Sequence, residues 1–357
     1  MRTIVVSDLH LGTRGARDVL RRAGPLAALA AAVEGADRLV LLGDALELRH
    51  GPLHEVLGAA TPVLAALGAA LGPGGEIVLV PGNHDHALLA PWLQERAEAG
   101  AAPLALDERA GPHATAALRR IAEAVAPARF DVAYPGLWLR EDVYALHGHY
   151  IDRCITLPTF ERLSAGVMNR VVGRLPVTGA TPEDFEAGLA PLYAWMHTVA
   201  QTTSPGWAAS RQSTSAKTWQ ALAGAGPRRL RARAAAAGFP LAIAGLNRAG
   251  LGPLRAELSG EELRRAGLAA MGEVVRLLGI DAPHVVFGHT HRAGPLPGDD
   301  EGEWRTPTGA ALHNAGCWID EPIFATGGPS SPYWGGRMLV VEDAEAPRLE
   351  RVVTKLG

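Results

Sequence analysis

Short apolar runs alternate with longer stretches of helical character over the first 150 residues of the chain. The runs at 3–6, 39–42 and 77–80 have the length and the branched side chains of buried strands. Residues 16–33 and 53–71 between them are rich in alanine and leucine, and a Gly-Pro-Gly-Gly stop signal follows the second stretch. The alternation predicts an α/β layered sheet with its functional site at the carboxyl ends of the strands.

The pattern becomes almost entirely helical near residue 151 and returns to strands near residue 280. Thr181 offers an N-cap directly before a proline, and apolar residues then recur at helical spacing from Phe185 to Val199. Pro191 lies inside this stretch and predicts a kink or a break. Further strands are predicted at 137–139, 143–146, 284–287, 311–314, 337–341 and 349–353.

The chain therefore divides into three segments. Residues 1–150 and 281–357 are expected to form the two parts of one core, and residues 151–280 are expected to form a helical insertion between them. The apolar face within the insertion has two interpretations, because it could line a pocket or form the interface of a homodimer.

The composition restricts the classes of protein that fit. A content of 48% hydrophobic and 20% charged residues is typical of a globular protein, and a formal charge of −3 argues against broad nucleic-acid contact. Cys154 and Cys317 form neither a disulfide framework nor a metal motif. The apolar residues after Met1 are too few for a secretory signal, and the apolar runs are shorter than a membrane span. These features predict a cytoplasmic protein.

Side chains that can bind metals or carry protons follow the predicted strands. Asn83, His84 and Asp85 come directly after the strand that ends at Val80. Residues of the same kind follow four other apolar runs, and these are Asp8, His10, Asp44, His147, His149, His289 and His291. The carboxyl ends of strands in one sheet meet at one edge, so the repeated pattern predicts a metal-dependent site there.

In chain order these residues form the motifs Asp-Leu-His, Gly-Asp, Gly-Asn-His-Asp, His-Gly-His and Gly-His-Thr-His. The set resembles the five motifs of the calcineurin-like metallophosphoesterases. The resemblance implies a four-layer α/β/β/α sandwich of two mixed sheets, with residues 151–280 as a large helical insertion that caps the site.

The resemblance also implies two divalent metal ions. The first would be bound by Asp8, His10, Asp44 and His291. Asp44 would bridge to the second ion, whose other ligands would be Asn83, His147 and His289. Ligands of this kind, without thiolates, suit Mn²⁺, Fe or Zn²⁺, and the ligand types alone do not choose among these metals. We expect Mn²⁺ first, with Fe, Zn²⁺ or Mg²⁺ as alternatives.

By the same resemblance, metal-bound hydroxide attacks phosphorus and His84 gives a proton to the leaving oxygen. Asp85 is expected to orient His84 and to raise its pKa. His149 would contact the substrate or a metal ligand, or would exchange ligand duty with His147. Glu47 and His50 are interpreted as an exposed pair of loop residues.

The stretch ending at Asp152, followed by a helical insertion, is similar to the UDP-2,3-diacylglucosamine pyrophosphatase-like branch. That branch would have an aspartate where His149 stands, and its insertion is shorter. The expected activity is hydrolysis of a phosphodiester, phosphomonoester or pyrophosphate in a small, lipid-linked or nucleotide-linked substrate. The alternatives are a nuclease and an inactive interaction scaffold. The basic run at 228–233 is either a solvated helix face or a peripheral contact with a membrane.

Overall fold

The computed structural model describes residues 1–157, 159–169, 171, 173–202, 242–255, 260–322, 324–325 and 327–356. Ten strands form one mixed sheet in the order β10-β9-β1-β2-β3-β5-β6-β7-β8, with β4 beside β5. The strands are β1 Arg2–Val6, β2 Arg38–Leu42, β3 Glu76–Val80, β4 Asp107–Arg109, β5 Arg129–Arg140, β6 Val143–Leu146, β7 His284–Phe287, β8 Ala311–Asn314, β9 Arg337–Glu342 and β10 Arg348–Arg351. Most of the predicted strands are therefore confirmed to within one or two residues.

Strand β5 joins the two halves of the sheet. Its first part pairs in parallel with β3, and its second part pairs antiparallel with β6. Strands β1, β2 and β3 run parallel in one half, and β6, β7 and β8 run parallel in the other. Only residues 137–139 of β5 were predicted as a strand, because Asp131 and Pro135 interrupt the apolar pattern of its earlier part. The expected separate sheets are thus continuous through one strand.

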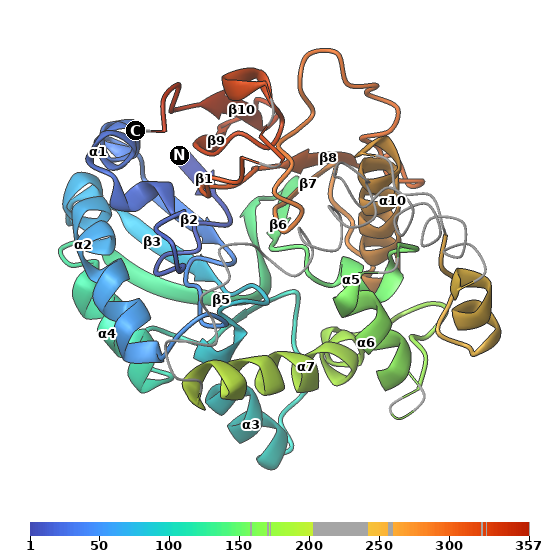
Figure 1. The fold of residues 1–357 in the computed structure, drawn as a ribbon. Helices are drawn as coiled ribbons and strands as arrows, with labels where there is room; N and C mark the ends of the chain where they lie inside the picture. The colour runs from blue at the N-terminus through green and yellow to red at the C-terminus, as the bar shows by residue number, and fades with distance from the viewer. Residues whose placement is uncertain are drawn as a thin grey trace, which may run out of the picture.

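The helices lie on the flanks of this sheet (Figure 1). They are η1 Val19–Arg21, α1 Ala23–Val33, α2 Leu53–Leu71, η2 His86–Leu88, α3 Ala90–Glu98, α4 Ala116–Ala124, α5 Ile151–Cys154, α6 Phe160–Met168, α7 Pro182–Thr202, α10 Gly260–Leu278 and η3 Gly328–Ser330. Residues 242–248 are also helical. The described residues between 151 and 280 contain helices and no strand, as the sequence predicts.

Local signals explain where several helices begin and end. Helix α2 ends where Gly72 adopts φ 74°, a left-handed conformation that costs glycine little, and the Gly72 amide donates to Gly68 O. In the first turn of α7, the Asp184 amide donates to Thr181 Oγ1 at 3.4 Å, and this bond confirms Thr181 as the predicted N-cap. Helix α7 continues through Pro191, so the predicted break is wrong.

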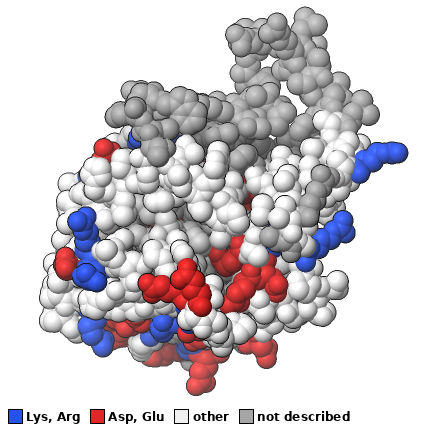
Figure 2. Space-filling view, turned by 90° about the horizontal axis from the view of Figure 1, so that it is seen from below, with Lys and Arg blue, Asp and Glu red and all other residues white. Residues whose placement is uncertain are grey.

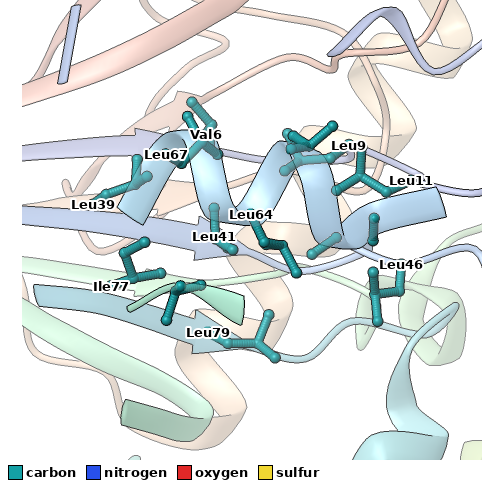
Figure 3. Packing of buried hydrophobic residues seen from close by; sticks show 14 of the residues in the cluster. Val6, Leu9, Leu11, Leu39, Leu41, Leu46, Leu64, Leu67, Ile77 and Leu79 are labelled. Carbon is teal, nitrogen blue, oxygen red and sulfur yellow. The ribbon is translucent and has the colours of Figure 1, made fainter. Parts of the chain in front are cut away.

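Three apolar clusters hold the layers together. In the first, α2 packs on β1, β2 and β3, and Figure 3 shows Leu64 and Leu67 over Leu41 and its neighbours. A second cluster packs α5, α7 and α10 against β6, β7 and β8. The third contains residues from both halves of the sheet, such as Val40 and Val286. Burial of these side chains is the main free-energy term that fixes the strand ends in place.

Helix α2 is long and apolar enough to cross a membrane by length and composition alone. Eight of its residues are buried, among them Leu64 and Leu67, which face the strands of the sheet. The helix therefore has the contacts of a core helix in this fold.

Candidate metal centre

Seven predicted metal ligands come together beyond the carboxyl ends of β1, β2, β3, β6 and β7. Five of them have positive φ angles, between 46° and 63°, which is rare for residues other than glycine. These five are Asp8, His10, Asp44, His289 and His291. Strained backbone of this kind persists only where the surrounding structure enforces it, and it concentrates at functional sites.

The motif glycines allow the ligand side chains to approach one another. A Cβ atom on Gly43 would overlap the His147 ring, and Gly43 also has φ 79°. A Cβ atom on Gly82 would overlap both Asp44 and the His147 ring. A larger residue at either position would therefore displace a predicted ligand.

One group consists of Asp8, His10 and His291. His10 Nε2 lies 3.1 Å from His291 Nε2, and His291 Nε2 lies 3.3 Å from Asp8 Oδ1. The buried Asp8 Oδ1 has no hydrogen-bond partner among the described residues. His10 Nδ1 lies 3.0 Å from a Glu47 carboxylate oxygen, so the ring donates there and Nε2 carries a lone pair. Lone pairs that converge in this way fit a bound cation.

A second group consists of Asp44, His147 and His289, with Asn83 beside them. His147 Nδ1 donates to the Leu42 carbonyl at 2.9 Å, which leaves the Nε2 lone pair 3.4 Å from Asp44 Oδ2. Asn83 Oδ1 lies 3.2 Å from His147 Nε2 and 3.1 Å from His289 Nδ1. These acceptors also converge, as ligands of a divalent metal do.

The side-chain amide of Asn83 can face the second group in either of two orientations, with its oxygen or its nitrogen toward the imidazoles. With Oδ1 toward the imidazoles it completes a cation site. Turned over, its nitrogen donates to both imidazoles and to Asp44, and its oxygen accepts from Arg49. The first orientation fits the metal-bound form, and the second satisfies the hydrogen bonds of the protein alone.

The pKa values show how strongly the two groups favour positive charge. Burial alone lowers the pKa of His147, yet Asp44 and Asp8 raise it to about 10. Burial likewise lowers the pKa of His10, and Glu47 with the two aspartates raises it to about 9. Although burial opposes it, the surrounding imidazoles lower the pKa of Asp44 well below its ordinary value. Carboxylates ionised in a buried site favour cations there.

The structure corrects the expected partner of His84. Asp85 is buried, and its oxygens accept hydrogen bonds from the amides of Gly82, Ala45 and Leu46, at 2.6, 2.7 and 3.2 Å. It therefore ties together the loops after β2 and β3 and does not contact His84.

Glu47 occupies the position expected for Asp85. His84 Nδ1 lies 2.9 Å from the Glu47 carboxylate, and the His84 amide donates to Asp44 Oδ1 at 2.7 Å. Glu47 is only 1% exposed, so its interpretation as an exposed loop residue is wrong. The loops after β1 and β2 pair beyond their strands, and the Glu47 amide donates to Leu11 O. This pairing brings the carboxylate beside His10 and His84 together.

Arg49 is a further residue that the sequence prediction missed. Its Nη1 lies 3.3 Å from His84 Nε2, and its guanidinium lies over the Tyr193 ring at 5.1 Å. Burial and the Arg49 charge lower the pKa of His84 to about 4 even though Glu47 opposes them, so the expected increase is wrong for these side chains. For Glu47, the sequence offered one signal of a buried role: the residue lies between two leucines, Leu46 and Leu48.

His149 belongs to neither group of ligands. It is buried beside His147, its Nε2 lies 3.4 Å from the Tyr134 hydroxyl, and its Nδ1 has no partner among the described residues. Tyr134 donates in turn to Glu186 of α7, whose other oxygen lies 2.8 Å from His86 Nε2. This buried network links α7 to the metal centre. In the described structure His147, and not His149, faces Asp44.

A cavity of about 280 Å³ opens over the two groups. Its walls come partly from the core and partly from α5, α6 and α10 of the insertion, which lie side by side (Figure 1). Ile151, Ile155 and Leu268 give one side an apolar surface, and His50 also lines the cavity. The apolar face of α7 lies elsewhere, because Phe185 and Leu189 are buried in the second cluster.

Buried imidazoles and carboxylates at the carboxyl ends of the strands in an α/β fold are the arrangement expected of a metal-dependent hydrolase. Residues 1–176 match the family described as calcineurin-like phosphoesterase. The protein is thus a metal-dependent phosphoric ester hydrolase, with clusters consistent with a dinuclear site.

Comparison with solved structures adds nothing to this assignment. A cold-active protein-tyrosine phosphatase from a psychrophilic Shewanella species is 14% identical, and the alignment covers 96% of this chain and 75% of that one. Its TM-score is 0.31, a likeness too low to carry an argument. No curated protein matches the chain.

Proposed function

We propose that the protein hydrolyses a phosphodiester, phosphomonoester or pyrophosphate bond with two divalent ions, Mn²⁺ being the first choice. The observation that carries the proposal is the presence of two neighbouring groups of converging acceptors, with Asp44 Oδ2 of the second group 3.9 Å from His10 Nε2 of the first and 3.4 Å from His147 Nε2. One group would comprise Asp8, His10, Asp44 and His291. The other would comprise Asp44, Asn83, His147 and His289. When bound, such ions neutralise the phosphate, generate a nucleophile from water and stabilise the leaving oxygen.

His84 is the proposed proton donor. Its Nδ1 is held by Glu47, so Nε2 would be the atom that gives a proton to a leaving oxygen. In the structure Nε2 accepts from Arg49 Nη1 at 3.3 Å, so the proposal requires Arg49 to turn from Nε2 to the phosphate. Burial and Arg49 hold the pKa of His84 low although Glu47 opposes them, and an anionic phosphate beside Nε2 that pairs with Arg49 would raise this pKa and favour the imidazolium form. Arg49 places a second positive charge at the same position and would bind a nonbridging phosphate oxygen.

We also propose that residues 151–280 form a cap over a core with four layers, in the order α/β/β/α. The three apolar clusters are the evidence for the layers. The residues of α5, α6 and α10 in the cavity walls are the evidence for the cap. A dimer through the α7 face is disfavoured, because Phe185 and Leu189 are already buried in the chain. The basic run at 228–233, the candidate membrane contact, lies outside the described residues.

A small, lipid-linked or nucleotide-linked phosphoester in the cytoplasm is the proposed substrate. The nuclease alternative is disfavoured by the charge of −3 and by the face in Figure 2, where acidic side chains gather near the centre and no continuous basic surface is visible. The inactive scaffold is disfavoured because all seven predicted ligands are present and clustered.

The direct test is a hydrolysis screen of the purified, Mn²⁺-loaded chain. The substrates are bis-p-nitrophenyl phosphate, p-nitrophenyl phosphate and nucleotide-sugar pyrophosphates, with a chelated sample as the control. Turnover that requires metal supports the proposal, and the preferred substrate identifies the bond. Absence of turnover on all three classes with two ions bound would contradict it.

A further inference from the structure

Two carboxylates of the insertion face the cavity with incomplete hydrogen bonding. Asp152 of α5 is only 5% exposed, and its Oδ1 lies 3.3 Å from His289 Nε2. Its Oδ2 is buried and has no hydrogen-bond partner among the described residues. Both Asp152 and Glu161 of α6 line the cavity over the metal groups.

Glu161 is also short of donors. Its nearest cation is Arg49, whose Nη1 lies 3.8 Å away, beyond the reach of a hydrogen bond. Within the described part of the chain no side chain donates to Glu161. Burial and the nearby Asp152 raise the pKa of Glu161 above its ordinary value, as expected for a carboxyl that lacks donors.

Buried acceptors in proteins nearly always have donors, so the buried Asp152 Oδ2 requires an explanation, and the half-buried Glu161 lies beside it on the cavity wall. Their charge is a second problem, because carboxylates beside a phosphate site repel an anionic ligand. A ligand that brings its own donor resolves both problems. The apolar wall formed by Ile155 and Leu268 would exclude water from the same contact.

We infer that Asp152 and Glu161 form a subsite for the organic group attached to the phosphate, and that this group carries a hydroxyl or ammonium donor close to the ester oxygen. The inference rests on the proposed function, since it assumes that a phosphate lies over the metal groups. Asp152 would use Oδ2 for the ligand while Oδ1 keeps His289 oriented. The substrate class is thus an amino-alcohol or polyol phosphoester.

The test compares three phosphates of equal length that differ in one terminal group: aminoethyl, hydroxyethyl and propyl phosphate. Their binding to the Mn²⁺-loaded full chain is measured by titration calorimetry, independently of turnover. Hydrogen bonds to a charged acceptor should make a donor-bearing phosphate bind roughly ten- to a hundredfold more tightly than propyl phosphate. Stronger binding of the aminoethyl compound indicates an amino alcohol, and stronger binding of the hydroxyethyl compound indicates a polyol.

Glu161→Gln should reduce this preference at least about threefold, because a neutral amide is a weaker acceptor. Glu321→Gln is the matched control. Glu321 also lines the cavity, but one of its oxygens pairs with Arg17 at 3.1 Å and the other lies 4.0 Å from His291 Nδ1. Its loss would act through the metal centre and should therefore affect the three ligands equally. Asp152→Asn should also weaken the preference and keep both ions.

Equal binding of the three phosphates to the wild-type chain overturns the inference, even if a variant fails to fold. A preference unchanged in Glu161→Gln, or lowered as much in Glu321→Gln, overturns it as well. Loss of an ion from Asp152→Asn would show that Asp152 serves the metal centre, directly or by orienting His289, and would remove it from the subsite. Hydrolysis of bis-p-nitrophenyl phosphate by the same sample separates the two proposals. If hydrolysis persists without any preference, the subsite fails and the proposed function stands.

Discussion

Glu47 connects the first metal group to the proposed acid, so Glu47→Gln should damage both. The carboxylate lies 3.0 Å from His10 Nδ1 and 2.9 Å from His84 Nδ1, and it is almost fully buried. Glutamine keeps one acceptor oxygen, but its nitrogen would meet the N–H group of the other imidazole. One charge-assisted hydrogen bond is then lost, at a cost of about 1.5–3 kcal/mol.

That cost can appear at either imidazole. If His10 loses its partner, affinity for one ion should fall roughly 10–100-fold, the usual effect of removing a hydrogen bond to a metal ligand. If His84 loses its partner, kcat should fall while metal affinity holds. Competition with a chromophoric chelator measures the first effect, and steady-state kinetics at saturating Mn²⁺ measures the second.

Glu55→Gln is the control, because Glu55 is an exposed carboxylate at the start of α2. It should change neither quantity. If Glu47→Gln keeps metal affinity and kcat within about twofold of the wild-type values, the effect is smaller than the roughly tenfold change that the weakest lost charged hydrogen bond should cause, and the expectation is refuted.

Four substitutions and one ligand probe the rest of the site. Asp44→Asn should lower occupancy of both ions, whereas Asn83→Ala should mainly empty one; elemental analysis that finds one ion or none in well-loaded wild-type protein contradicts both. His84→Ala should keep the ions and lose roughly 10²–10⁴-fold in kcat, less for esters with good leaving groups; loss of metal would refute its role as an acid. Gly82→Ala should lower metal affinity, because its Cβ would overlap Asp44 and the His147 ring, and unchanged affinity in a metal titration would show that the loop can yield. Bound phosphate should slow hydrogen exchange in α5, α6 and α10, and exchange that ignores phosphate would argue against the cap.

The sequence by itself determined the framework of this protein. Short branched runs are buried on both faces, so their hydrophobicity alone located most strands. The residues that follow the parallel strands β1, β2 and β3 must meet at one edge of that half of the sheet. The meeting of Asp8 with His291 needed the tertiary structure, because β7 runs opposite to β1 and strand β5 joins the two halves so that their carboxyl ends lie together.

Only the tertiary structure decided which side chains hold the ligands and the proposed acid. Asp85 follows His84 directly in the chain, yet the backbone amides of two loops bind its carboxylate. Glu47 reaches His84 because the loops after β1 and β2 pair beyond their strands. Hydrogen-bond partners depend on the direction in which each side chain leaves a strained loop, and sequence spacing does not record that direction.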